Sequence, residues 1–243
     1  MKSISKKSGQ NLKFLSPSSS GGENRKKIMM VDDHPLTRAG LIQLMAKQHD
    51  LVVCCEAAGR NDALQYVEHN EPDLVIMDLS IPGGGGLELI KDLLTLYPKL
   101  PILVLSMYDE NLYAARALRA GARGYVMKEA GAESVVQAIR TVLAGEVYLS
   151  PRMTAKIVES VSQRSSPPSA SPLEVLSDRE LEIFKCIGEG RSTKEIAARL
   201  NLSPKTVDVH RANIRAKLDL EDANTLFRYA VCWVESPQWQ GPG

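Results

Sequence analysis

The stretch VIMDLSIPGGGG, Val75 to Gly86, passes from apolar residues to a single aspartate, Asp78, and ends in four glycines. A near-continuous apolar run is typical of a parallel strand that is buried on both faces. Open α/β folds place their reactive groups at the carboxyl ends of such strands. The stretch therefore predicts an α/β fold with Asp78 at a functional edge of the sheet.

Short apolar runs alternate with segments of helical periodicity over residues 27–144, and leucine and alanine recur there at three-and-four spacing. The apolar runs are KIMMV (27–31), LVVCCEA (51–57), LVIM (74–77), ILVL (102–105) and GYVM (124–127). Successive strand–helix units of this kind predict a doubly wound, five-stranded parallel sheet with helices on both faces.

The periodic segments that follow residue 177 are all helical. The sequences SDRE (177–180) and STKE (192–195) fit the capping box, and Ser203 precedes a proline at a first helical position. We expect helices to begin near residues 178, 193, 204 and 223. The short NLS interval (201–203) between the second and third is typical of a helix-turn-helix. The pattern predicts a small all-α, four-helix domain.

The chain is thus expected to contain five parts. They are a disordered basic tail (1–26), an α/β domain (27–146), a linker with a short helix near 153–162 (147–176), a helical domain (177–235) and a flexible C-terminus (236–243). Prolines and serines in QRSSPPSASP (163–172) cannot sustain a helix, so this part of the linker lets the two domains touch or separate.

Composition limits the function. An apolar fraction of 44%, a charged fraction of 24% and a net charge of +1 describe an ordinary globular protein, so nucleic-acid binding would need a local basic patch. We expect no membrane span, because no stretch of about 20 apolar residues is present. The four cysteines lack zinc-site or disulfide spacing and are expected to be core residues in a reducing compartment. A cytoplasmic location is predicted, since the basic N-terminus lacks the apolar segment of a secretory signal.

Polar residues end four of the five predicted strands, and these ends meet at one edge of a parallel sheet. They are Asp32 and Asp33, Asp78, Ser106 and Lys128. Three carboxylates in one cleft need a compensating cation, and hard oxygen ligands suit Mg²⁺. With the ammonium and the hydroxyl, the cluster predicts a pocket for a phosphoryl group carried on a carboxylate.

The motifs VDDHP, IMDLSIPG, VLSM and GYVMK make residues 27–144 similar to the receiver domain of two-component response regulators. The resemblance implies that Asp78 accepts a phosphoryl group from a histidine kinase. It also implies that Asp33, Asp78 and the backbone carbonyl of Ser80 bind Mg²⁺, and that Asp32 acts on the metal through a water. By the same resemblance, Ser106 is the switch hydroxyl, Tyr125 is the switch aromatic residue and Lys128 is the partner of the phosphoryl group. The glycines at 83–86 would let the backbone curl back toward the metal.

Residues 177–235 resemble the LuxR-type helix-turn-helix of the NarL/FixJ class through LSDRELEIF, RSTKEIAARLNLSPKTVDVH and NIRAKL. On the third helix, Val207, His210, Ile214 and Leu218 share a face that should pack inward. The opposite face is available to a major groove, and four basic residues against one acidic residue in 203–218 give it a local charge of +3. The candidate DNA contacts are Lys194, Lys205, Thr206, Asp208, Val209, Arg211, Ala212 and Arg215.

Together these features predict a DNA-binding transcriptional regulator controlled by phosphorylation, not an enzyme beyond slow autodephosphorylation. We expect a histidine kinase and double-stranded DNA as partners, a homodimer after phosphorylation, and a receiver that covers the recognition helix at rest. An apolar stripe on the fourth helix (Leu226, Tyr229, Ala230, Trp233) is either a dimer contact or domain core. The alternative is a regulator that binds DNA constitutively.

The sequence fits two other classes of protein poorly, a hydrolase class and the P-loop nucleotide-binding proteins. Haloacid-dehalogenase-type hydrolases also use an aspartate after a strand, but they need a second aspartate two residues later, where this chain has Ser80. The glycines at 83–86 could suggest a nucleotide-binding loop. A P-loop, however, requires a Gly-Lys-Ser/Thr sequence after its glycines, which is missing here.

Overall fold

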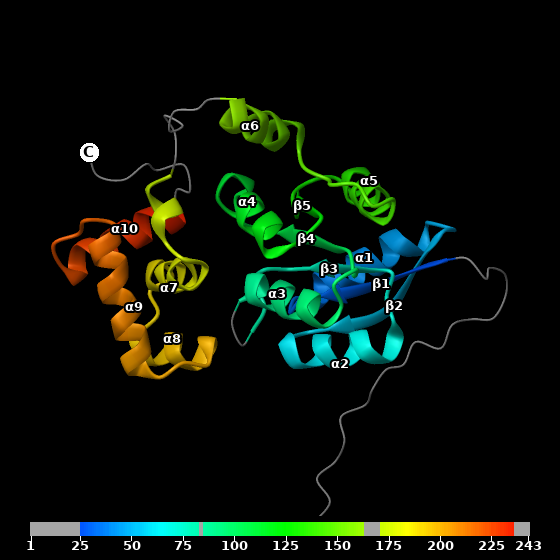
Figure 1. Ribbon diagram of the computed structural model, residues 1–243. Coiled ribbons are helices and arrows are strands. Elements are labelled where there is room, and N and C mark those ends of the chain that lie inside the picture. The colour runs from blue at the N-terminus through cyan, green and yellow to red at the C-terminus, as the bar shows by residue number, and fades with distance from the viewer. Residues whose placement is uncertain (1–24, 83–84, 163–170, 236–243) are drawn as a thin grey trace, which may run out of the picture.

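The computed structural model describes residues 25–82, 85–162 and 171–235. Its sheet has five parallel strands in the order β2-β1-β3-β4-β5 (Figure 1). The strands are β1 (Lys26–Val31), β2 (Leu51–Ala57), β3 (Leu74–Met77), β4 (Ile102–Ser106) and β5 (Gly124–Met127). The strand order reverses between β1 and β3, which is where open α/β sheets bind their ligands. The predicted sheet is confirmed.

Alternating side chains of the strands supply two separate cores. Met29 and Val31 of β1 face one core, and Ile28 and Met30 face the other, as the period of a strand requires. The helices α2 (Arg60–Asn70), α3 (Gly86–Leu96) and α4 (Glu110–Ala120) cover the first core. The helices α1 (Pro35–Ala46) and α5 (Ala132–Leu143) cover the second. The strands are buried on both faces, which explains their apolar sequences.

The glycine-rich loop after β3 returns close to the end of that strand. At Gly86 an added Cβ would lie 2.5 Å from the Cα of Leu79, so only glycine fits there. Gly85 has a φ of +58°, a left-handed conformation that glycine adopts without strain. These two residues let α3 begin directly beside Asp78.

After α5 the chain forms α6 (Pro151–Ser162), which confirms the short helix expected in the linker. The Ser150 hydroxyl donates a hydrogen bond to Glu110 at 2.9 Å and Met153 is buried, so the start of α6 lies against α4. The predicted C-terminus (236–243), the tail up to residue 24 and linker residues 163–170 lie outside the described residues. Lys26, placed in the tail by the prediction, already belongs to β1.

The helical domain consists of α7 (Asp178–Gly188), α8 (Thr193–Leu200), α9 (Pro204–Lys217) and α10 (Ala223–Glu235). A short 3-10 turn, η1 (Pro172–Val175), precedes it within the last residues of the predicted linker. Both predicted capping boxes form, at Ser177 with Glu180 and at Ser192 with Glu195. The three helix starts predicted from the caps and the fourth start, expected near residue 223, are confirmed.

The apolar stripe of α10 belongs to the domain core. Leu226, Tyr229 and Ala230 are buried, and the ring of Phe184 on α7 contacts the rings of Tyr229 and Trp233 at centroid distances of 5.4 and 5.8 Å. This packing answers the question that the sequence left open, because a stripe buried against α7 is not free to form a dimer.

The cysteines divide into three environments. Cys186 is buried as expected, Cys54 and Cys55 are partly exposed, and Cys232 is exposed. The prediction that all four are core residues is therefore wrong for Cys232, because this residue of α10 lies off the buried stripe. Among the described helices, none is both long and apolar enough to cross a membrane.

Candidate functional site

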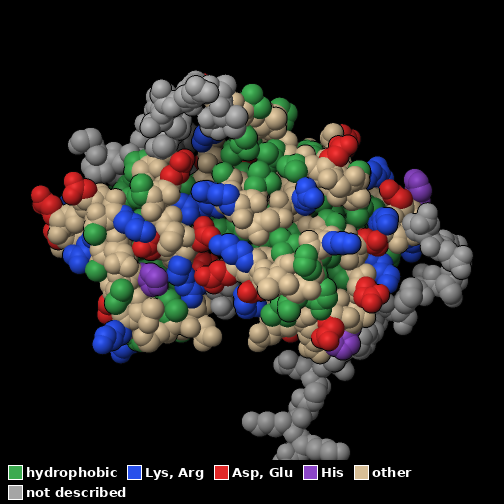
Figure 2. Space-filling view, in the orientation of Figure 1, with side chains coloured by type: hydrophobic (Ala, Val, Ile, Leu, Met, Phe, Trp, Pro, Cys, Tyr) green, Lys and Arg blue, Asp and Glu red, His purple; other side chains and the backbone are tan. Residues whose placement is uncertain are grey.

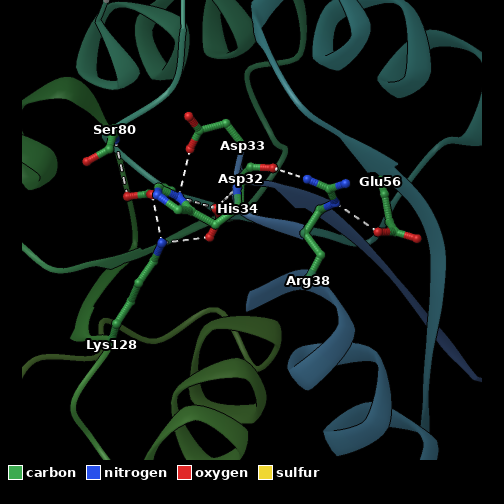
Figure 3. A network of polar contacts seen from close by, with 8 residues as sticks. Asp32, Asp33, His34, Arg38, Glu56, Ser80 and Lys128 are labelled. Carbon is green, nitrogen blue, oxygen red and sulfur yellow. Dashed lines mark hydrogen bonds and ion pairs between the residues drawn. The ribbon is translucent and has the colours of Figure 1, made fainter. Parts of the chain in front are cut away.

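A buried acidic pocket lies at the carboxyl ends of β1 and β3. Asp32 and Asp78 are only 3% and 2% exposed, and Lys128, at the end of β5, donates to both carboxylates at 2.7 Å (Figure 3). Burial opposes the charge on the Lys128 ammonium, but the hydrogen bonds and charges of Asp32 and Asp78 outweigh it and raise the pKa of the lysine. The pocket therefore holds a permanent positive charge between two carboxylates.

The pocket has donor atoms suited to a divalent cation. Asp32, Asp33, His34 and Asp78 each offer one ligand atom, and these atoms lie within 4.8 Å of one another. Asp33 Oδ1 is buried and lies 2.8 Å from His34 Nδ1, yet it lacks a partner with hydrogen-bond geometry. A hard cation such as Mg²⁺ would satisfy this carboxylate oxygen, so the residues fit the metal predicted from the sequence. His34, 60% exposed at its side chain, was not predicted.

Ser80 and Ser106 also reach the region of Asp78. The backbone N–H of Ser80 donates to Asp78 Oδ1 at 3.2 Å. The Ser106 side chain is fully buried, and its hydroxyl accepts a hydrogen bond from the backbone N–H of Tyr108 at 3.3 Å. The predicted residues of the first domain thus share one edge of the sheet.

Tyr125 points into the protein and ends at the same loop. Its hydroxyl donates to the backbone carbonyl of Tyr108 at 2.7 Å, and burial raises the pKa of this phenol. The predicted switch residues Ser106 and Tyr125 therefore both bind the backbone of Tyr108, which the sequence analysis missed. The position of Tyr108, two residues after the serine that ends β4, was the sequence signal that could have indicated this role.

Arg38 of α1 and Glu56 of β2 form an ion pair, here called the clamp, beside the acidic pocket. The Arg38 guanidinium donates to Glu56 at 2.9 Å and to the backbone carbonyl of Asp32 at 2.7 Å (Figure 3). Because Arg38 and Glu56 lie far apart in the sequence and in different elements, no local motif signals their pairing. The clamp fixes the loop that carries Asp32 and Asp33.

The helical domain docks on this edge of the first domain through one face of α7. Glu182 Oε1 accepts a hydrogen bond from the Gly85 N–H at 2.7 Å. Asp178 accepts from Lys91 at 2.8 Å and from Arg116 of α4 at 3.1 Å. In Figure 2, acidic and basic side chains lie side by side across the junction of the two domains. This charged face of α7 was not predicted, although its residues recur at helical spacing.

Two further contacts strengthen the docking. Arg116, with a side chain that is 5% exposed, also donates to the backbone carbonyl of Leu173 at 3.0 Å. The Lys185 ammonium donates to the Tyr108 hydroxyl and lies over the Tyr108 ring. Ser80, Tyr108, Glu182 and Lys185 line a small cavity of about 30 Å³ between the domains, which is room for about one water molecule.

The face of α9 that the sequence predicts to contact DNA is exposed. Val207 and Ile214 are buried, and His210 and Leu218 are partly buried, so the predicted inward face is found. Lys194, Lys205, Asp208, Val209 and Ala212 are exposed, whereas Thr206, Arg211 and Arg215 are partly exposed. The Thr193 hydroxyl lies between Asp208 Oδ1 at 3.4 Å and Arg211 at 3.3 Å, which positions both side chains.

The docked first domain does not cover this face of α9. Within the part of the chain that the structure describes, hydrogen bonds between the domains reach α7 and the segment just before it. Val209, near the middle of this face of α9, is 53% exposed. The expectation that the receiver covers the recognition helix is therefore wrong for this conformation, because α7 provides the charged surface that the first domain binds.

Comparisons with known proteins agree with both halves of the chain. Residues 28–140 match the family model of the response regulator receiver domain, and residues 174–230 match that of the bacterial regulatory proteins of the luxR family. The oxygen regulatory protein NreC of Staphylococcus carnosus is 39% identical over 209 residues, which cover 84% of this chain and 96% of NreC.

Solved structures resemble the chain as well. A LuxR-family two-component response regulator from Aurantimonas is 35% identical, with a TM-score of 0.54, over 57% of this chain and 99% of its own. RcsB of Salmonella enterica serovar Typhimurium, bound to the P1flhDC promoter with the phosphomimetic BeF3-, is 25% identical, with a TM-score of 0.64, over 86% of this chain and 100% of its own. The chain belongs to the response regulators that join a receiver domain to a LuxR-type DNA-binding domain and control transcription in response to phosphorylation.

Proposed function

We propose that Asp78 is the residue that accepts the phosphoryl group, and that the donor is a histidine kinase. A carboxylate oxygen of Asp78 attacks the phosphorus of a phosphohistidine, a P–O bond forms, the P–N bond breaks and the imidazole leaves. The supporting observation is the position of Asp78, which is buried at the switch point of the sheet and held by Lys128 at 2.7 Å. Asp32 and Asp33 flank it at the end of β1.

The residues of the acidic pocket would have different roles in phosphoryl transfer. Asp33, Asp78 and the backbone carbonyl of Ser80 would hold Mg²⁺, with Asp32 reaching it through a water. When bound, Mg²⁺ supplies positive charge that neutralises the transferred phosphoryl oxygens. Lys128 would supply a second positive charge. Because its ammonium already bridges Asp32 and Asp78, it needs little movement to bind the phosphoryl group.

We infer that the phosphoryl group acts on DNA binding through Tyr108. The Ser106 hydroxyl would turn from the Tyr108 N–H toward the phosphoryl oxygens, and Tyr125 would follow into the space that it leaves. Both changes remove hydrogen bonds from the backbone of Tyr108, whose side chain binds Lys185 of α7. The docked helical domain is then released, and two receivers pair.

Release and pairing explain why phosphorylation would strengthen DNA binding although α9 is already exposed. A single α9 with a local charge of +3 makes few phosphate contacts, and helix-turn-helix proteins gain affinity by placing two copies on adjacent half-sites. Docking on one receiver restricts the orientations that let two helical domains reach such half-sites together. We therefore propose that the phosphorylated homodimer, acting in the cytoplasm on double-stranded DNA, is the active form, and that turnover is limited to slow autodephosphorylation.

The test of the acceptor is labelling by acetyl phosphate and Mg²⁺ followed by intact mass measurement. Wild-type protein should gain one phosphoryl group, and Asp78→Asn should gain none, because an amide cannot form the acyl phosphate. Asp62→Asn, on the exposed surface of α2, is the matched control and should be labelled like the wild type. Undiminished labelling of Asp78→Asn would remove the assignment.

A second candidate function, constitutive DNA binding, is favoured by the exposure of Val209 and its neighbours on α9. Sedimentation and gel-shift titrations, with and without acetyl phosphate, separate the two candidates. Our proposal requires both a larger dimer fraction and tighter binding after phosphorylation. If labelled protein shows neither change, the chain binds DNA constitutively and its receiver has another task.

A further inference from the structure

Cys54 and Cys55, adjacent residues of β2, have sulfur atoms only 3.4 Å apart. In a regular strand consecutive side chains point to opposite faces of the sheet, so adjacent cysteines would be separated. Here the register between β1 and β2 shifts: Ile28 pairs with Val53, but Met29 pairs with Cys55. Cys54 is the extra residue of a β-bulge, and the bulge is what brings the two thiols together.

The packing confirms this change of direction. Val53 packs against the core that α1 and α5 cover, whereas Cys54 and Cys55 both pack against the core that α2 covers. Both cysteines are partly exposed, and β2 is an edge strand of the sheet. The two thiols therefore lie together on one face, at a border of the sheet that solvent can reach.

We propose that Cys54 and Cys55 form a chelating site for a thiophilic ion of the trivalent arsenic class. Within the described residues, the one group of three or more His, Cys, Asp or Glu ligands is the acidic pocket. The cysteine pair thus offers two thiolates and no further protein ligand, which suits a pyramidal ion that keeps its third substituent. A structural zinc site would require four ligands.

The sulfur separation in the unbound protein is already close to that of a chelated pyramidal ion. At a metal–sulfur distance of about 2.3 Å, a tetrahedral angle would place two sulfurs about 3.8 Å apart. The observed 3.4 Å corresponds to an angle of about 95° at the same bond length. Narrow angles of this kind are typical of trivalent arsenic, whose lone pair reduces the angles between its bonds.

Oxidation to a disulfide fits the pair less well. Consecutive Cα atoms lie about 3.8 Å apart across a trans peptide, whereas disulfides usually join Cα atoms about 4.4 to 6.8 Å apart. A disulfide between Cys54 and Cys55 would distort the backbone of β2. Chelation needs only small rotations of the two side chains, because the sulfurs already converge.

One of the two thiols, that of Cys54, is favoured as the first to react. A hydrogen bond from Cys55 lowers the pKa of Cys54, with a contribution from the charge of Lys27, and the same interaction raises the pKa of Cys55. The thiolate is the reactive form of cysteine. With an arsenoxide, R–As=O, two As–S bonds form, two S–H bonds break and the oxygen leaves as water. The oxidation state of arsenic does not change, so no oxidant or reductant is required.

The experiment titrates the full-length protein with phenylarsine oxide and follows adduct mass and free thiols. Wild-type protein should bind one equivalent and lose two titratable thiols. A small dithiol should reverse this reaction, and a monothiol should not. Cys54→Ser and Cys55→Ser should each bind about 100-fold more weakly, because a single sulfur loses the effective concentration of the second. Cys232→Ser, which removes an exposed thiol outside the pair, should bind like the wild type.

A further variant tests the pair without changing β2. The Cys186→Ala/Cys232→Ser double variant keeps only Cys54 and Cys55, so it should still bind one equivalent of phenylarsine oxide with the loss of two thiols. Failure of this variant to bind, or wild-type affinity in Cys54→Ser, would overturn the proposal.

Discussion

The ammonium of Lys185 lies 3.7 Å from the ring centroid of Tyr108, which joins α7 of the DNA-binding domain to the loop after β4. A cation above a tyrosine ring contributes about 0.5 to 2 kcal/mol, depending on how far it is desolvated. The backbone of the same tyrosine binds Ser106 and Tyr125. Under the proposed function, a change at the acidic pocket would therefore reach the second domain through Tyr108.

Arg116→Ala should release the helical domain without phosphorylation. The variant loses the ion pair with Asp178 and the hydrogen bond to the carbonyl of Leu173, and both contacts cross the junction of the domains. Small-angle X-ray scattering should show a larger radius of gyration, and gel shifts should show several-fold tighter DNA binding. Arg119→Ala is the control on the same helix, because Arg119 is exposed and donates within α4. Identical scattering curves for the two variants would contradict the docking role.

Lys128→Ala should leave phosphorylation intact and weaken the response to it. Two buried carboxylates lose their common cation, which should cost about 3 kcal/mol of unfolding free energy in the presence of a chelator. Since Mg²⁺ can replace the missing charge, it should raise the melting temperature of the variant more than that of the wild type. Lys99→Ala, at an exposed position, is the control. A wild-type gain in DNA affinity after labelling would argue against a role for Lys128 in the switch.

Asp208→Asn should tighten DNA binding. The carboxylate lies on the exposed face of α9 and repels phosphates, whereas asparagine keeps the acceptor for the Thr193 hydroxyl. We expect an affinity several-fold higher and a salt dependence steeper by up to about 0.9 in log–log slope, which corresponds to one more phosphate contact. Glu221→Gln removes an exposed charge outside α9 and should change neither quantity. Weaker binding by Asp208→Asn would show that the carboxylate reads a base.

Glu180→Gln should lower stability at neutral pH and lose this effect in acid. Burial disfavours the Glu180 carboxylate, but Lys217 at 2.6 Å and Ser177 outweigh it and hold the pKa below its usual value. A carboxyl group with a lowered pKa stabilises the fold above its unfolded pKa of about 4.5, and this stabilisation is lost as the pH falls through the folded pKa. Urea unfolding should show a free energy of unfolding about 1 to 2 kcal/mol lower for the variant at pH 7, a value discounted because Lys217 is exposed. This difference should shrink toward pH 3. A difference that does not depend on pH would rule out the charge as its cause.

The parts of this protein that follow local rules were predictable. Apolar runs defined the strands, and the caps at Ser177, Ser192 and Ser203 defined three helix starts, because each capping bond joins residues three apart. The convergence of Asp32, Asp78 and Lys128 followed from the direction of parallel strands. The docking of the two domains was not predictable in this way. It depends on pairs such as Gly85 with Glu182, which are 97 residues apart and share no motif.

The position of α7 has a consequence for engineering. Leu181 and Phe184 on one side of this helix belong to the buried core of the DNA-binding domain, while Glu182 and Lys185 on the other side bind the receiver. The receiver therefore contacts α7 on the side that does not pack in the core, and under the proposed function it would change the position of the DNA-binding domain without contacting α9. Chimeric regulators in which the receiver domain is exchanged should keep their operator preference, provided that the new receiver offers hydrogen-bond partners for Glu182 and Lys185 of α7.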